Sequence, residues 1–180
     1  MSVYFYGCIT LDGFLADKNH QLDWLHETGS SEETTYEAFY KKMDVTVMGK
    51  RTYDYIKNIP NFEKFYAATK NYVLTSHKDE VSDQFTPISG DIASFIYSLP
   101  QDKNIWIIGG NTLVTPLLNR DLFDYLIIQI APVILGEGVP LFKDITRNLR
   151  YELESVSKYG QFVEIVFKKR SKWALYFLFV

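Results

Sequence analysis

Apolar runs recur along the 180-residue chain and alternate, in its first two thirds, with segments in which apolar residues follow helical spacing. A run without a polar face is typical of a strand that is buried on both sides. Such runs predict strands over residues 3–10, 45–48, 71–75, 105–108 and 122–130, with a short further strand at 86–89. Helical spacing and helix-start residues predict helices over residues 30–42, 51–57, 91–99 and 112–119.

The last third of the chain has a different pattern. Residues 132–140 contain two glycines and two prolines and predict a loop, whereas residues 151–158 and 162–169 flank Tyr159-Gly160 and predict a hairpin. Strands that first alternate with helices and later follow one another predict an α/β fold. Its central sheet is mostly parallel and has an antiparallel C-terminal edge. We expect a single domain over residues 1–170.

The final segment, residues 171–180, is almost wholly apolar after Lys168-Lys169-Arg170. Its eight consecutive apolar residues are too few to cross a bilayer as a helix, which takes about 20. The segment is interpretable as a strand added to the sheet or to a partner subunit, as a buried tail, or as a non-native extension. We favour packing in the core or at a dimer interface. Together with the aromatic surplus, this predicts a homodimer.

The composition narrows the range of partners. Hydrophobic residues make up 47% of the chain, aromatic residues 16% and charged residues 23%, and the net charge is −3. Without a basic stripe, nucleic acid is not an expected partner. The single cysteine, Cys8, excludes internal disulfides and cysteine zinc clusters, and we expect no metal site. The first residues lack a basic region and a cleavage site, so we expect a cytoplasmic protein without a secretory signal.

Two strand ends pass into helices through glycines. Gly109 and Gly110 follow the apolar strand at 105–108 and precede a helix that begins with Asn111, Thr112 and Leu113. A helix start offers unpaired N–H groups and the positive end of the helix dipole to an anion, and glycine lets a ligand reach the backbone. An ordinary tight turn would use the same residues.

The second junction adds positive charge to the same arrangement. Gly49 ends the strand at 45–48, and Lys50, Arg51 and Thr52 begin the next helix. Cations at a helix start oppose the dipole, and an anion bound between them would explain the arrangement. A solvated helix start with harmless charges is the alternative. Two such junctions favour a phosphate-rich cofactor.

Several motifs in this order resemble one family. They are Thr10-Leu-Asp-Gly13, Val47-Met-Gly-Lys-Arg-Thr-Tyr53, Tyr72-Val-Leu-Thr-Ser76, Ile107-Ile-Gly-Gly110, Ala131-Pro132 and Gly136-Glu-Gly138. The chain resembles the dihydrofolate-reductase-like family over about residues 2–168, in the branch related to the C-terminal reductase domain of the riboflavin-biosynthesis deaminase/reductase. The resemblance implies a three-layer fold with a mostly parallel sheet, NADPH as cofactor, and frequent dimers.

Carried over residue by residue, the resemblance implies a cofactor site. Thr10 would lie near the nicotinamide, and Thr75 and Ser76 near the adenine ribose. Gly49, Lys50, Arg51 and Thr52 would hold the pyrophosphate and the 2′-phosphate side of the adenosine. The opposite side of the pyrophosphate would be held by Gly109, Gly110, Asn111, Thr112 and Leu113. For Thr75 and Ser76, a polar strand end is an equally good explanation.

The substrate side departs from the family pattern. A basic residue that the riboflavin branch has in its first strand falls at Tyr6. A carboxylate for catalysis is predicted at Glu33, with Glu32 or Glu37 as alternatives, although Glu33 also suits a capping box with Ser30. Asp12 is the second catalytic candidate, and as a turn residue beside Gly13 it has a structural explanation too.

Trp24 is the predicted substrate contact, as a lid over a planar ring, with core packing as the alternative. His26 is a conceivable acid, but a surface role suits it better. The expected function is an NADPH-dependent reductase that transfers hydride to a C=N or C=O bond of a small heterocyclic substrate, pterin- or pyrimidine-like. The alternatives are a non-catalytic dinucleotide-binding protein of the same fold and a flavin-linked or NADH-preferring variant.

Overall fold

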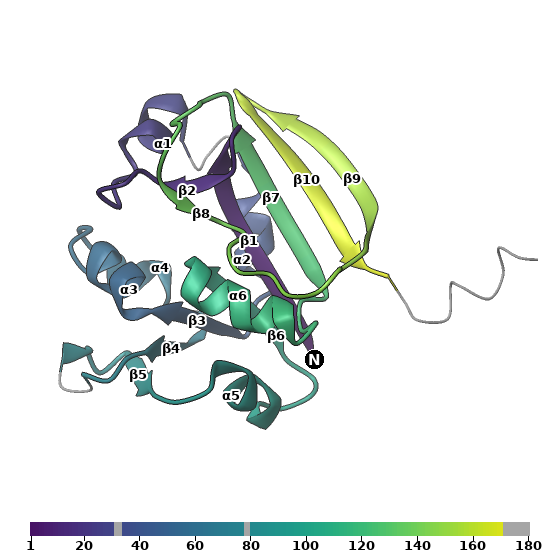
Figure 1. Cartoon of the computed structure of the whole chain (residues 1–180). Helices are drawn as coiled ribbons and strands as arrows, with labels where there is room; N and C mark the ends of the chain where they lie inside the picture. Colours follow the sequence, from purple (N-terminus) through teal and green to yellow (C-terminus); the bar gives the residue numbers. More distant parts are fainter. Residues whose placement is uncertain (31–33, 78–79, 171–180) are drawn as a thin grey trace, which may run out of the picture.

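Eight strands form one sheet in the order β5-β4-β3-β6-β1-β7-β10-β9 (Figure 1). The computed structural model describes residues 1–30, 34–77 and 80–170. All neighbouring strands from β5 to β7 run parallel, whereas β10 is antiparallel to both β7 and β9. The strands are β1 (Ser2–Thr10), β3 (Val45–Gly49), β4 (Lys70–Leu74), β5 (Phe85–Ile88), β6 (Asn104–Gly109), β7 (Tyr125–Ala131), β9 (Tyr151–Tyr159) and β10 (Phe162–Lys169). The predicted mostly parallel sheet with an antiparallel C-terminal edge is confirmed.

Helices cover both faces of this sheet and complete three layers (Figure 1). The helices are α1 (Asp23–Thr28), α2 (Tyr36–Tyr40), α3 (Lys50–Ile56), α4 (Phe62–Phe65), α5 (Ile92–Ser98) and α6 (Asn111–Asn119). One face packs against α5 and α6 through a largely aliphatic cluster that also includes Phe5, together with Ile96 and Leu117. The other face packs against α2, α3 and α4 through a cluster rich in aromatic rings.

The aromatic surplus of the sequence lies in this second cluster. Tyr6 of β1 stacks on Phe39 of α2 with ring centroids 4.6 Å apart, and Trp106 of β6 meets Phe39 edge-on at 5.5 Å. Tyr53 and Phe85 extend the cluster toward β5 at 5.2 Å. Because these rings stabilise the core, their abundance is no argument for a dimer.

Four short elements were not predicted, and one of them is helix α4. Helix α1 begins after Leu22, which makes no side-chain cap, so the sequence lacks the usual start signal. Strands β2 (Phe14–Ala16) and β8 (Val139–Pro140) form a two-stranded sheet, and β8 lies at the end of the loop predicted over residues 132–140. Each is too short for a periodic pattern and exists only because distant segments pair.

The helix predicted over residues 30–42 is wrong in length, since α2 comprises only Tyr36–Tyr40. Of the capping box proposed for its start, Glu33 lies outside the described residues, as do Glu32 and the tail at 171–180. Strand β7 begins at Tyr125 rather than at residue 122, and the Asp124 carboxylate just before it accepts a hydrogen bond from the Val3 N–H at 2.8 Å. Among the described residues, no helix is both long and apolar enough to cross a membrane.

Candidate functional site

The two glycine junctions lie beside each other. Strands β3 and β6 are parallel neighbours, with Met48 opposite Gly109, so Gly49 and Gly110 emerge at the same edge of the sheet. β4 pairs with the other side of β3, and Gly49 lies opposite Leu74, just before Thr75. β1 is the next strand beyond β6 and ends at Thr10. The topology thus brings the predicted cofactor residues to four adjacent strand ends, the usual ligand position in open α/β sheets.

Neither Gly49 nor Gly110 is required by the protein's own structure. Gly49 has φ −81° and ψ 159°, and Gly110 has φ −80° and ψ −157°, which are extended values open to other residues. A Cβ built on Gly49 would meet only Leu113 Cδ1, at 3.9 Å, and one on Gly110 would meet nothing within 4 Å. Free space next to the backbone at both junctions is what a ligand in contact with the main chain needs.

Gly109 differs from these two glycines. Its φ of +113° lies in a region that L side chains rarely adopt, so the turn itself requires glycine here. The peptide bond between Gly109 and Gly110 is cis. Both α3 and α6 begin without a side-chain cap, which leaves the first N–H groups of the helices directed at the junctions. The side chain of Leu113 is buried in the core, and its N–H already donates to the Gly110 carbonyl at 3.0 Å.

A cavity of about 410 Å³ lies beside the β3 junction. It is lined by Lys50, Leu74, Thr75, Ser76, His77, Ser89 and Gly90. The structure therefore brings together three of the predicted cofactor residues, Lys50, Thr75 and Ser76. The Thr75 hydroxyl accepts a hydrogen bond from the His77 N–H at 2.9 Å, which fixes the turn that closes this end of the cavity.

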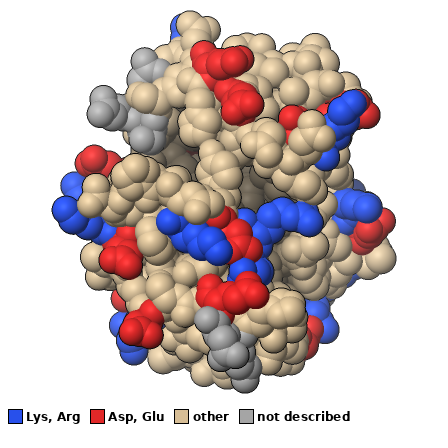
Figure 2. Space-filling model, turned by 90° about the vertical axis from the view of Figure 1, so that its left-hand side faces the viewer, with Lys and Arg blue, Asp and Glu red and all other residues tan. Residues whose placement is uncertain are grey.

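Lys50 is already paired with carboxylates at this cavity. Its Nζ lies 2.7 Å from Asp54 and 2.8 Å from Glu80, and these hydrogen bonds, chiefly that of Asp54, raise the pKa of Lys50. Arg51 is exposed and contacts the His20 ring at 3.1 Å. Figure 2 shows basic and acidic side chains next to each other below a hollow in this face of the molecule.

Thr10 and Asp12 connect two loops. The buried Thr10 hydroxyl donates to Asp12 Oδ1 at 2.6 Å, and Asp12 Oδ2 accepts from the N–H groups of Leu135 and Gly136 at 3.1 and 2.7 Å. These hydrogen bonds, that of Thr10 first, lower the pKa of Asp12. An ionised carboxylate held in this way is unsuited to donate a proton near neutral pH. The catalytic role of Asp12 stays a prediction, and the geometry favours its role in holding the loops.

Trp24 of α1 is 6% exposed and packs against Ala131 and Phe162. This arrangement corresponds to core packing, the alternative to the predicted lid over the substrate. The Trp24 Nε1 has no hydrogen-bond partner in the described part of the chain. His26 contacts the hydroxyl of Tyr55 at 3.0 Å at the surface. Glu33, the remaining predicted catalytic residue, lies outside the described residues.

A buried polar cluster was missed by the sequence reasoning. Glu164 of β10 and Gln129 of β7 are each 5% exposed, and Tyr6 of β1 is 6% exposed. The Glu164 carboxylate accepts from the Thr35 hydroxyl at 2.5 Å and from Gln129 Nε2 at 3.0 Å, and Gln129 Nε2 also donates to the Tyr6 hydroxyl at 2.8 Å. Burial is the main cause that raises the pKa of Tyr6. The signal that the sequence offered was a single polar residue inside an otherwise apolar strand, at Gln129 and at Glu164.

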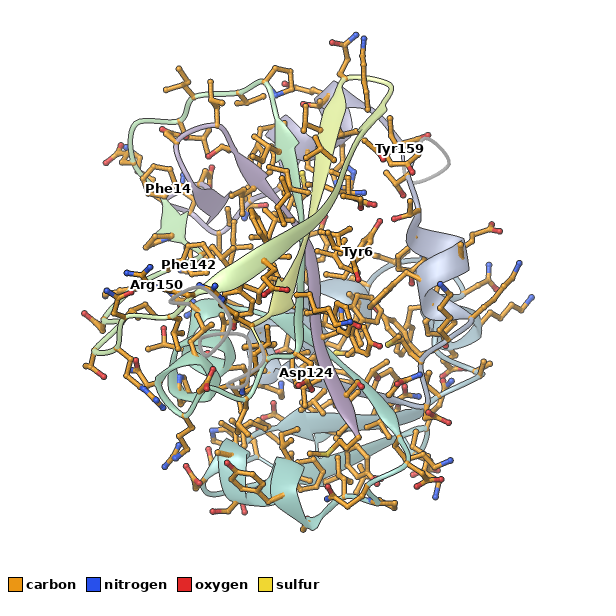
Figure 3. All side chains as sticks on the ribbon, turned by 90° about the vertical axis from the view of Figure 1, so that its right-hand side faces the viewer. Tyr6, Phe14, Asp124, Phe142, Arg150 and Tyr159 are labelled. Atoms are coloured by element: carbon orange, nitrogen blue, oxygen red, sulfur yellow. The ribbon has the colours of Figure 1, made fainter. Side chains whose placement is uncertain are left out.

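Figure 3 shows Tyr6 on the side of the sheet that α2 covers, opposite Phe14 and Phe142. In the stretches 1–30, 34–77 and 80–170, no group of three or more His, Cys, Asp or Glu side chains is arranged to hold a metal ion.

Comparison with known proteins agrees with the architecture. The family described as the RibD C-terminal domain matches residues 2–165. The uncharacterised Bacillus subtilis protein YwjB is 34% identical over 164 residues, which cover 89% of this chain and 93% of that protein. The crystal structure of a "Putative riboflavin biosynthesis protein" from Shewanella sp. PV-4 has a TM-score of 0.81 at 25% identity, covering 95% of this chain and 100% of the other.

A dihydrofolate reductase from Enterococcus faecalis, complexed with NADP(H), has a TM-score of 0.63 at 13% identity and covers 94% of this chain and 97% of its own. At that identity the similarity is one of fold. The expected dihydrofolate-reductase-like fold is confirmed.

Proposed function

Because the chain belongs to the family of the RibD C-terminal domain, we propose that it is a reductase that uses NADPH to reduce a C=N or C=O bond of a small heterocyclic substrate. The observation that supports this most is the pair of adjacent glycine junctions with free space at Gly49 and Gly110. The cofactor supplies hydride when bound, and the protein supplies orientation and charge.

The described residues suit the parts of NADPH. The main chain at Gly49 and Thr52 and at residues 109–112 would bind the pyrophosphate, because N–H groups at a helix start donate to phosphate oxygens. Lys50 and Arg51 would contact the 2′-phosphate, and Thr75 and Ser76 the ribose. Thr10 would border the nicotinamide, with its hydroxyl occupied by Asp12.

Proton delivery falls to water in this proposal. Asp12 is ionised and bound to two loop N–H groups, and His26 lies at the surface against Tyr55. Glu33 remains a sequence-based candidate for orienting that water. In this proposal, catalysis therefore depends on how the nicotinamide is positioned against the substrate, and not on a strongly acidic protein side chain.

Titration with NADPH tests the proposal directly. We expect saturable quenching of the fluorescence of the chain's tryptophans, followed by oxidation of the bound cofactor by at least one ketone, imine or pterin in a broad panel. Binding without turnover on the whole panel would favour the alternative, a non-catalytic dinucleotide-binding protein. The absence of any affinity for reduced or oxidised nicotinamide dinucleotides would exclude both.

A homodimer through β9 is part of the same proposal. β9 is the outer edge of the sheet (Figure 1), and it exposes Leu153 and Val156 to 62% and 56%. Pairing with β9 of a second copy, antiparallel and centred on Val156, would bring Glu154 of each copy, at the register shift between β9 and β10, close to Lys158 of the other. Such a contact is self-complementary, as a two-fold interface requires.

Charge reversal tests this interface. Lys158→Glu places like charges opposite each other in both symmetric pairs, so we expect the dimer dissociation constant to rise about tenfold. The double variant Lys158→Glu/Glu154→Lys restores the opposite charges and should recover the parent value in sedimentation analysis. A parent chain that is monomeric at all concentrations, or a double variant no better than the single one, contradicts the pairing.

A further inference from the structure

Arg51 at the start of α3 is a cation without a counter-charge in the described part of the chain. There its side chain makes polar contacts only with the His20 ring, with Nη1 3.1 Å from Nε2 and 3.3 Å from Nδ1. The neighbouring Lys50 differs, because Asp54 and Glu80 both bind its Nζ. Arg51 therefore keeps an uncompensated positive charge at the junction, and the group held against it is a histidine.

The turn between β2 and α1 presents His20 to α3. Asp17 Oδ1 accepts hydrogen bonds from the N–H groups of Asn19 and Gln21 at 2.8 and 2.7 Å, and the Asp17 carbonyl oxygen accepts from the His20 N–H at 3.0 Å. His20 has a φ of +63°, in the left-handed region that histidine, asparagine and aspartate adopt more readily than most residues. The position of His20 is thus set by its own turn and not by the contact with Arg51 alone.

The contact with Arg51 requires a neutral His20 ring. A guanidinium group has only hydrogen-bond donors, and both nitrogens of a protonated imidazole are donors as well. Protonation would therefore place two like charges in contact, and imidazole rings change their charge between about pH 5 and 8. His26 in the same segment differs, because its Nε2 contacts the Tyr55 hydroxyl at 3.0 Å, and a hydroxyl can either donate or accept.

The other charged groups around this contact do not compensate it. In the turn, Asp17 is bound by main-chain N–H groups, and Lys18 binds Glu137 at 2.6 Å. On α3, Asp54 is bound by two neighbouring lysines. Asp23, in the first turn of α1, forms no ion pair within the described residues. An anion that binds to Arg51 would therefore be the group that decides the charge of His20.

We propose that His20 takes up a proton from solution when a phosphate dianion binds to Arg51, so that the affinity for the cofactor depends on pH. This inference rests on the proposed function, since the dianion is the 2′-phosphate of NADPH. The dianion offsets the repulsion that keeps the ring neutral, and imidazolium and guanidinium both donate charge-assisted hydrogen bonds to it. His20 thereby adds a second positive charge for NADPH. NADH lacks that phosphate and gains nothing from it.

Calorimetry in two buffers with different ionisation enthalpies, HEPES and Tris, measures the protons taken up on binding. At about pH 7.5 and low ionic strength, which limits screening of these exposed side chains, the parent should take up about half a proton with NADPH and none with NADH. That uptake corresponds to about a threefold loss of NADPH affinity for each unit of rising pH. A phosphate monoester loses its second proton near about pH 6, so the ligand is already a dianion in this range.

His20→Asn removes the titrating ring and keeps a side chain that suits the left-handed backbone. This variant should bind NADPH without proton uptake and with little dependence on pH, and His20→Gln serves the same comparison if His20→Asn does not fold. The matched control His26→Gln should keep the uptake of the parent, because the contact with Tyr55 accepts either charge state.

The outcomes separate this inference from the proposed function. If NADPH binds to the parent without proton uptake, or if folded His20→Asn takes up as many protons as the parent, the role of His20 is overturned and the proposed function stands. Uptake that disappears only on replacement of His77, which lines the cavity, has the same meaning. A parent protein without any affinity for NADPH overturns both.

Discussion

Replacing Gly49 with alanine is expected to weaken NADPH binding about a hundredfold while the fold persists. The added methyl group would occupy the space in which the protein itself places only Leu113 Cδ1, at 3.9 Å. It would therefore push the pyrophosphate away from the helix N–H groups, each of which contributes about 1.5–3 kcal/mol to binding a charged acceptor. Fluorescence titration of the variant with NADPH measures the loss.

The stability of the same variant is the internal control. Gly49 has dihedral angles that alanine adopts readily, and alanine at the start of a helix costs about 0.5–1 kcal/mol. We expect the unfolding temperature to fall by no more than about 4 °C. Asp102→Ala, at an exposed site beyond the opposite ends of the strands, should leave both quantities unchanged. An NADPH affinity equal to that of the parent in folded Gly49→Ala would show that no ligand approaches this backbone.

The sheet and the two glycine junctions at its edge were predictable because local signals determine both. Long apolar runs specify the buried strands. A glycine at the end of such a run marks the passage from strand to helix, and this signal does not depend on how the elements pack. Parallel topology then forces Gly49 and Gly110 to the same edge. The sequence could not show that Lys50 is already bound to Glu80, because Glu80 is 30 residues away and approaches only through the turn after β4.

The buried polar cluster depended on register, which a single sequence does not reveal. Gln129 and Glu164 are single polar residues in apolar strands, and only the antiparallel pairing of β7 with β10 places them opposite each other. Trp24 was open to two interpretations because an aromatic residue after a loop suits a lid as well as a core. Its burial follows from contact with Phe162, which is 138 residues away along the chain.

The double variant Lys50→Ala/Arg51→Ala is expected to weaken NADPH binding about thirtyfold and NADH binding no more than about threefold. The 2′-phosphate distinguishes the two cofactors, and a dianion that binds two cations gains most from charge-assisted hydrogen bonds. Lys50 lines the cavity and its side chain is only 19% exposed, so its contact is less screened than a surface pair. Parallel titrations with both cofactors at one ionic strength measure the difference.

Lys57→Ala is the matched control, because Lys57 binds the same Asp54, at 2.6 Å, and does not line the cavity. Glu80→Gln tests whether Glu80 competes with the 2′-phosphate for Lys50. Glu80 occupies Lys50 as a phosphate would, so its neutralisation should strengthen NADPH binding and leave NADH nearly unchanged. Equal losses for both cofactors in the double variant would refute the phosphate contact. The acidic neighbours of Lys50 would then favour the NADH-preferring alternative, because a carboxylate beside the ribose repels a 2′-phosphate.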